Sequence, residues 1–107
     1  MELIAKTRFD LRNSHTGMEF RIYKPVFDSD FDAWSCRIEI DEPINVQLSL
    51  RGSDSMHALI LALRHASTYI YGSDLYRQKL IGIDGQYGGN LFLPAPETLL
   101  DIAPYPC

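Results

Sequence analysis

Acidic residues in the first half of the chain have the spacing of ligands in a calcium-binding loop. At positions 1, 3, 5 and 12 of the EF-hand pattern stand Asp28, Asp30, Asp32 and Glu39. Position 6 is Ala33, where that loop requires glycine for its sharp turn. Residues 34–40 alternate between apolar and polar, which predicts an extended strand. Such a strand carries Glu39 about 20 Å from Asp32, at roughly 3.3 Å per residue. We therefore expect a solvated acidic turn and no metal site.

Two histidines fall in a segment with helical spacing. Zinc-binding helices place their histidines four residues apart, so that both side chains reach one ion. Eight residues separate His57 from His65, which corresponds to a rise of about 12 Å along a helix. They cannot share an ion, and we expect both to face solvent.

A serine, an aspartate and a histidine also lie close together at residues 53–57. Ser55 would lie about 160° around the helix axis from His57, and Asp54 is better placed to cap the helix. Catalytic triads are assembled from distant segments of the chain, so this local cluster does not indicate one.

The glycine-rich segment Gly82–Gly89 lacks the lysine of a P-loop and the spacing of a dinucleotide site. We predict a loop or tight hairpin there, no catalytic residues and no cofactor.

The elements that must position these residues follow from the periodicity of apolar side chains. Residues 3–11, 18–26, 34–40 and 46–50 alternate with the period of two typical of half-buried strands. Short connections between them favour an antiparallel meander. A helix should begin at residues 52–55 and end near Gly72 in a left-handed conformation. Its buried stripe should consist of Met56, Leu59, Ile60, Leu63, Ala66 and Ile70.

The segments after this helix give weaker signals. A short helix is expected over residues 74–80, and a last strand over residues 91–93. The sequence therefore predicts an α+β fold, in which an antiparallel sheet of four to five strands packs on one long helix in the second half of the chain.

Composition limits the classes of function. The chain has 107 residues, of which 46% are hydrophobic, and we expect a single domain spanning residues 1–107. The net charge is −4, and the lysines and arginines are scattered, which disfavours nucleic-acid binding. The longest apolar run, Ala58–Leu63, is too short to cross a membrane. We expect a cytoplasmic protein with two free thiols, Cys36 and Cys107.

Two segments resemble parts of small bacterial domains of unknown function. In those domains a glycine and a capping Asp-Ser open an Ala/Leu-rich helix after several antiparallel strands, as Gly52–Leu63 does here. The segment Gly89–Pro94 is similar to their closing Leu-Pro segment. Some such domains resemble immunity proteins of polymorphic and contact-dependent toxin systems, which neutralise a cognate toxin by binding it. The resemblance implies a binding function and transfers no catalytic residues.

Our leading hypothesis is an immunity-type protein, not an enzyme, that neutralises a toxin or effector with a basic surface by steric occlusion. The expected contacts are the acidic turn, the nearby Asp41 and Glu42, an aromatic residue and one apolar residue within the polar helix face. These residues are Asp28, Asp30, Asp32, Asp41, Glu42, Tyr87 and Leu61. Leu61 is either covered by the C-terminal segment or exposed as an anchor. The alternatives are a homodimeric adaptor pairing through an edge strand at Met18–Val26, and a small enzyme using His57 or His65.

Overall fold

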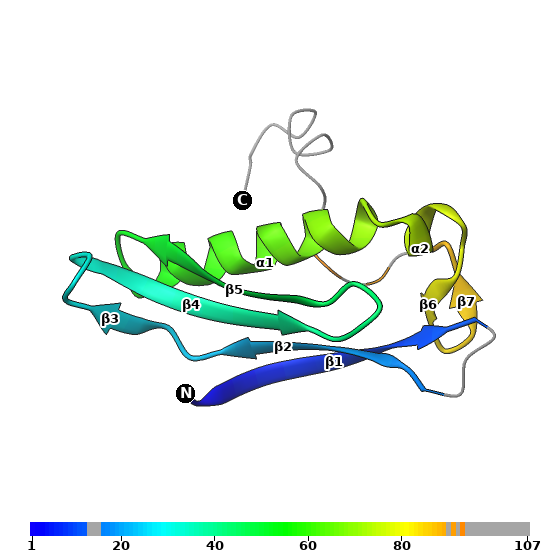
Figure 1. Cartoon of the computed structure of the whole chain (residues 1–107), viewed down its shortest axis with the longest axis horizontal. Helices are drawn as coiled ribbons and strands as arrows, with labels where there is room; N and C mark the ends of the chain where they lie inside the picture. The colour runs from blue at the N-terminus through cyan, green and yellow to red at the C-terminus, as the bar shows by residue number, and fades with distance from the viewer. Residues whose placement is uncertain (13–15, 90, 92, 94–107) are drawn as a thin grey trace.

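The computed structural model of the chain describes residues 1–12, 16–89, 91 and 93, which form a sheet with one long helix packed against it (Figure 1). The strands are β1 (Leu3–Leu11), β2 (Met18–Tyr23), β3 (Val26–Asp28), β4 (Ala33–Ile40), β5 (Val46–Gly52), β6 (Ile81–Ile83) and β7 (Gln86–Tyr87). The helices are α1 (Ser55–Tyr71) and α2 (Asp74–Arg77). The predicted α+β class, with the long helix in the second half of the chain, is confirmed.

The four long strands form the predicted antiparallel meander. Strands β1 and β2 pair, β2 pairs with β4, and β4 pairs with β5 over its whole length. The short strand β3 continues the line of β2 along the same edge of β4, after an interruption at Lys24 and Pro25. Proline interrupts the strand because it has no N–H to donate to a ladder. Beyond the prediction, the β6–β7 hairpin adds to the other side of β1.

This topology corrects the proposed dimerisation edge. Strand β2, which makes up most of the segment Met18–Val26, lies between β1 and β4 and has both of its edges paired. Its backbone groups are already used within the sheet, so it cannot pair with a second copy.

The core lies between one face of the sheet and α1. Strands β1, β2 and β4 contribute alternate side chains to it, and those that are almost fully buried are Phe9, Met18, Phe20, Ile22, Cys36, Ile38 and Ile40. The helix contributes Ala58, Ala62, Ala66 and Ile70, each with no exposed surface. Alternate residues of a strand face the same side, which explains why the period-two pattern predicted these strands.

The predicted helix stripe is partly wrong. Met56 is 63% exposed and Ile60 is 38% exposed, whereas Ala58 and Ala62 are fully buried. The helix is rotated so that its alanines face the sheet, because small side chains allow the two backbones to come close. Such a close approach occurs at Gly52, where an added Cβ would lie 2.4 Å from the backbone nitrogen of Ala58.

The ends of the elements are set by particular residues. Asp54 caps α1 as expected, since its Oδ1 accepts a hydrogen bond of 2.7 Å from the backbone N–H of His57. Gly72 ends the helix with φ −83°, so the predicted left-handed conformation is wrong. Glycine suits this position because a Cβ would lie 2.7 Å from the carbonyl oxygen of Thr68.

The glycine-rich segment forms the predicted tight hairpin. Asp84 and Gly85 connect β6 to β7, with φ values of 52° and 78°. Positive φ at both central residues is typical of two-residue hairpin turns, and Asp-Gly is a common sequence there. The expected last strand does not form at Leu91 or Leu93, and Phe92 lies outside the described residues.

Within the described part of the chain, no helix is long and apolar enough to cross a membrane.

Cys36 is a free thiol buried in the core, and its Sγ donates a hydrogen bond of 3.3 Å to the carbonyl oxygen of Tyr23. Burial raises the pKa of this thiol above its usual value, which keeps it protonated. Cys107 lies outside the described residues.

Candidate functional site

Strand β3, the turn after it and the first two residues of β4 form one end of the elongated molecule (Figure 1). We call this segment, residues 26–34, the acidic tip. The carboxylate of Asp28 accepts a hydrogen bond of 3.0 Å from the backbone N–H of Asp30. The backbone N–H of Phe31 donates to the carbonyl oxygen of Asp28 at 3.2 Å. These bonds close the turn locally, while Asp30 and Asp32 remain exposed to solvent.

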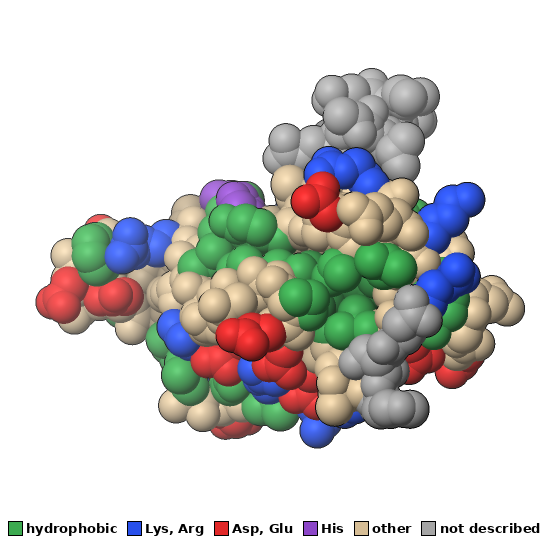
Figure 2. Space-filling view, turned by 45° about the vertical axis from the view of Figure 1, so that its right-hand side comes forward, with side chains coloured by type: hydrophobic (Ala, Val, Ile, Leu, Met, Phe, Trp, Pro, Cys, Tyr) green, Lys and Arg blue, Asp and Glu red, His purple; other side chains and the backbone are tan. Residues whose placement is uncertain are grey.

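Hydrophobic side chains are exposed among these carboxylates. Val26 is 54% exposed, Phe27 is 52% exposed and Phe31 is 56% exposed. The ring of Phe27 packs edge-to-face on Trp34, with 5.9 Å between ring centroids. The guanidinium of Arg51 lies 3.6 Å above the centre of the Phe31 ring. Figure 2 shows this end of the molecule at the left, with hydrophobic, acidic and basic side chains side by side.

Asp41 and Glu42, which we expected near the acidic turn, lie at the other end of β4. An eight-residue strand separates the two groups, which corresponds to about 26 Å. The carboxylate of Asp41 is also engaged, since Arg21 Nη2 lies 2.7 Å from its Oδ1. The expectation of a single acidic surface is therefore wrong, because an extended strand carries its two ends far apart.

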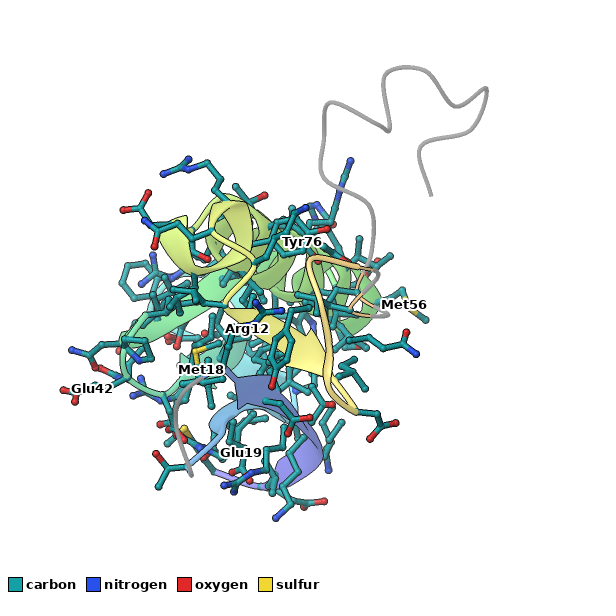
Figure 3. The ribbon with its side chains drawn as sticks, turned by 90° about the vertical axis from the view of Figure 1, so that its right-hand side faces the viewer. Arg12, Met18, Glu19, Glu42, Met56 and Tyr76 are labelled. Atoms are coloured by element: carbon teal, nitrogen blue, oxygen red, sulfur yellow. The ribbon has the colours of Figure 1, made fainter. Side chains whose placement is uncertain are left out.

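Leu61 and Tyr87 also lie away from the acidic tip. Leu61 is half-buried in the middle of α1, and its backbone carbonyl lies 2.9 Å from His65 Nδ1. Tyr87 belongs to the β6–β7 hairpin at the opposite end of the molecule, where the guanidinium of Arg12 lies 4.7 Å from its ring centroid. Figure 3 views that end directly, with Arg12 below Tyr76 of α2 and Glu42 projecting at the left margin. Of the seven contact residues expected from the sequence, the structure therefore brings together Asp28, Asp30 and Asp32.

Sequence reasoning missed the exposed hydrophobic residues of the acidic tip. Phe31 stands between two aspartates, and Val26 and Phe27 immediately precede Asp28. A turn rich in carboxylates has no core in which to bury large apolar residues. Their presence in this turn was therefore the signal in the sequence that apolar side chains would be exposed there.

The outer face of the sheet, opposite α1, carries a network of charges. Arg21 of β2 contacts three carboxylates: Glu19 Oε1 at 2.9 Å, Glu39 Oε1 at 3.2 Å and Asp41 Oδ1 at 2.7 Å. Arg37 contacts Glu39 at 3.0 Å, and Lys6 lies 3.8 Å from Glu19. Positive and negative charges are thus paired across neighbouring strands, and such cross-strand pairs stabilise a sheet.

This network shifts the pKa values of its members. The hydrogen bond from the Tyr23 hydroxyl, followed by that from Arg37, lowers the pKa of Glu39. The hydrogen bond from Arg21 lowers the pKa of Asp41, and the bond to Glu39 raises the pKa of Tyr23. The shifts of Glu39 and Asp41 favour the ionised carboxylates, and the shift of Tyr23 favours the protonated hydroxyl that donates to Glu39. The network therefore holds the strands together.

The residues considered for catalysis have structural partners. His57 is exposed, and its Nδ1 accepts a hydrogen bond of 3.0 Å from the backbone N–H of Ser53. The Oγ of Ser53 lies 3.3 Å from the same nitrogen, while Asp54 is used as the helix cap. His65 is exposed as predicted. Among the described residues, no three histidine, cysteine or acidic side chains are grouped so that they could hold a metal ion.

These features define a small α+β domain with an exposed hydrophobic and acidic turn. The chain belongs to a family of domains of unknown function, DUF6968, whose model matches residues 5–95. No match is found among curated proteins or among solved structures. The family description assigns no activity and does not place the chain among immunity proteins.

Proposed function

We propose that this domain is a protein-binding module of the immunity type, which inhibits a cognate bacterial toxin or effector by covering part of its surface. The observation that carries the proposal is the acidic tip, where Val26, Phe27 and Phe31 are each more than half exposed. Exposed apolar side chains surrounded by charged residues are typical of protein-interaction surfaces.

The two kinds of side chain would act on different steps of binding. Phe31 would serve as the central anchor, because aromatic residues carry a large share of binding energy at protein interfaces. The carboxylates of Asp28, Asp30 and Asp32 would select a basic partner and accelerate its association. The net charge of −4 favours the same class of partner.

The test begins with capture of partners from native cytoplasm, followed by binding kinetics on the recovered protein. Replacing Asp28, Asp30 and Asp32 together by asparagine should slow association about tenfold at low salt, and added salt should reduce the difference. Asparagine keeps a side-chain oxygen that can accept the turn hydrogen bond at position 28, so the fold should be preserved.

Phe31→Ala should leave association nearly unchanged and accelerate dissociation at least tenfold. The matched control is Glu42→Gln, which removes an exposed carboxylate at the far end of β4 and should bind as wild type does. If both tip variants bind the partner like wild type, the acidic tip is not the contact surface. Turnover of a small substrate that is lost on His57→Ala would instead support an enzyme.

A further inference from the structure

Over much of its length, the edge of β1 that faces away from β2 has no partner strand among the residues that the structure describes. Strand β6 pairs with β1 only at Asp10 and Leu11, and the backbone N–H of Arg12 donates to the carbonyl oxygen of Leu80 at 2.8 Å. Figure 1 shows β6 at the C-terminal end of β1. Backbone groups of an antiparallel strand alternate between its two edges. Those of Lys6 and Arg8 therefore point the same way as those of Asp10, and no described strand pairs with them.

An apolar groove lies between this edge and α1. It has a volume of about 170 Å³ and is lined by Ala5, Lys6, Thr7, Phe20, Ile22, Leu63 and Leu93. Ala5 and Thr7 share the face of Phe9, which is buried under the helix. For comparison of size, an apolar cavity of roughly 150 Å³ holds a benzene molecule. The groove can therefore take one large apolar side chain from a strand that pairs with β1.

The other face of the same edge is basic. Lys6 and Arg8 point away from the helix, opposite Arg21 and Glu19 of β2, and both are exposed. The side chain of Lys6 is 60% exposed, although it lies 3.8 Å from Glu19. A second copy of β1, pairing through the same backbone groups, would place Lys6 opposite Lys6 or Arg8 of the other copy. Like charges directly opposite each other destabilise a strand pair, whereas acidic side chains there would be favoured.

We propose that the open β1 edge binds an extended peptide of another protein, in which acidic residues alternate with large apolar residues. The peptide adds a strand to the sheet through the backbone groups of Lys6 and Arg8. Its apolar side chains enter the groove beside Ala5 and Thr7, and its carboxylates contact Lys6 and Arg8 on the outer face. This site is separate from the acidic tip and does not depend on the function proposed for it.

Fluorescence polarisation with labelled synthetic peptides tests this proposal on the full chain. A peptide of alternating Glu and Leu should bind at least tenfold more tightly than a peptide of the same composition whose alternation is scrambled. It should also bind at least tenfold more tightly than a peptide of alternating Lys and Leu. Equal binding of the three peptides would overturn the proposal, as would no binding of any.

Charge reversal supplies the matched variants. Lys6→Glu combined with Arg8→Glu should invert the preference, so that the Lys-Leu peptide binds more tightly than the Glu-Leu peptide. Lys79→Glu, which reverses an exposed charge after α2, should leave the preference unchanged. Replacing Asp28, Asp30 and Asp32 by asparagine should leave peptide binding unchanged. The proposal for the β1 edge and the proposal for the acidic tip can therefore fail independently. An unaltered preference in the double variant would refute the assigned contacts.

Amide hydrogen exchange distinguishes the occupants of the edge. In the free protein the amides of Lys6 and Arg8 should exchange rapidly, and the Glu-Leu peptide should protect them. The amide of Thr7, which faces β2, should be protected with or without peptide. Protection of Lys6 and Arg8 in the free protein would mean that residues 94–107 or a second copy already cover the edge. That result would overturn the proposal of a foreign peptide.

Discussion

Removing the Arg21 guanidinium should destabilise the sheet by an amount that depends on pH. Arg21 makes three contacts with carboxylates, and its side chain is only 22% exposed. Ion pairs of this exposure contribute roughly 0.5 to 1 kcal/mol each after solvent screening. Arg21→Gln should therefore lower the free energy of unfolding by about 2 kcal/mol at neutral pH. The assay is urea denaturation followed by far-ultraviolet circular dichroism.

The direction of the pH effect follows from the carboxylates. In the folded protein the pKa values of Glu39 and Asp41 lie below their usual values of 4.5 and 3.8. A carboxylate with a lowered pKa stabilises the fold above its unfolded-state pKa, and this contribution is lost as the pH falls through its folded-state pKa. The difference between wild type and Arg21→Gln should thus be complete at pH 7 and should shrink progressively below about pH 4.

The control is Arg37→Gln, because among the described residues Arg37 forms an ion pair with one carboxylate, that of Glu39 at 3.0 Å. This variant should lose less than about 1 kcal/mol at neutral pH. A loss below 0.5 kcal/mol for Arg21→Gln, or an equal loss for the two variants, would refute the argument that the three contacts act together. A loss for Arg21→Gln that is the same at pH 7 and at about pH 3 would show that charge is not its cause.

Further predictions concern the core and the helix start. Ile38→Ala, at a side chain with no exposed surface, should cost about 2 to 5 kcal/mol in urea melts, and a loss under 1 kcal/mol would contradict the assigned core. Asp54→Ala should cost about 1 kcal/mol, because the N–H of His57 loses its acceptor, whereas Asp54→Asn should stay within a few tenths of wild type. Gly52→Ala should lower the thermal midpoint by several degrees, because its Cβ would approach the Ala58 backbone to 2.4 Å; an unchanged midpoint would show that the helix can move away.

The strands could be predicted from the sequence because one buried face imposes a strict period of two. Ile38 and Ile40 alternate with Arg37 and Glu39, and an extended strand buries the first pair while leaving the second pair partly exposed. The rotation of α1 could not be predicted in the same way. Its apolar residues cover most of the helix circumference, and the burial of Ala58 in place of Met56 depends on how closely the helix approaches the sheet.

The candidate site was only partly predictable. The acidic turn could be identified because Asp28, Asp30 and Asp32 are close together along the chain. Its separation from Asp41 depends on the extended conformation of the whole of β4, and the same geometry had already excluded Glu39 as a calcium ligand. No local sequence pattern predicts the open edge of β1, because this edge depends on which residues of β1 pair with the distant strand β6.

The buried thiol of Cys36 gives the protein an internal reporter of its own opening. A thiol-specific reagent cannot reach a side chain with no exposed surface while the helix covers the sheet. In a chain whose Cys107 is replaced by serine, modification of Cys36 therefore requires a transient separation of α1 from the strands. When reclosing outpaces the chemical step, the labelling rate measures the population of that separated state. The covering of the sheet by its helix can thus be followed without introducing any foreign probe.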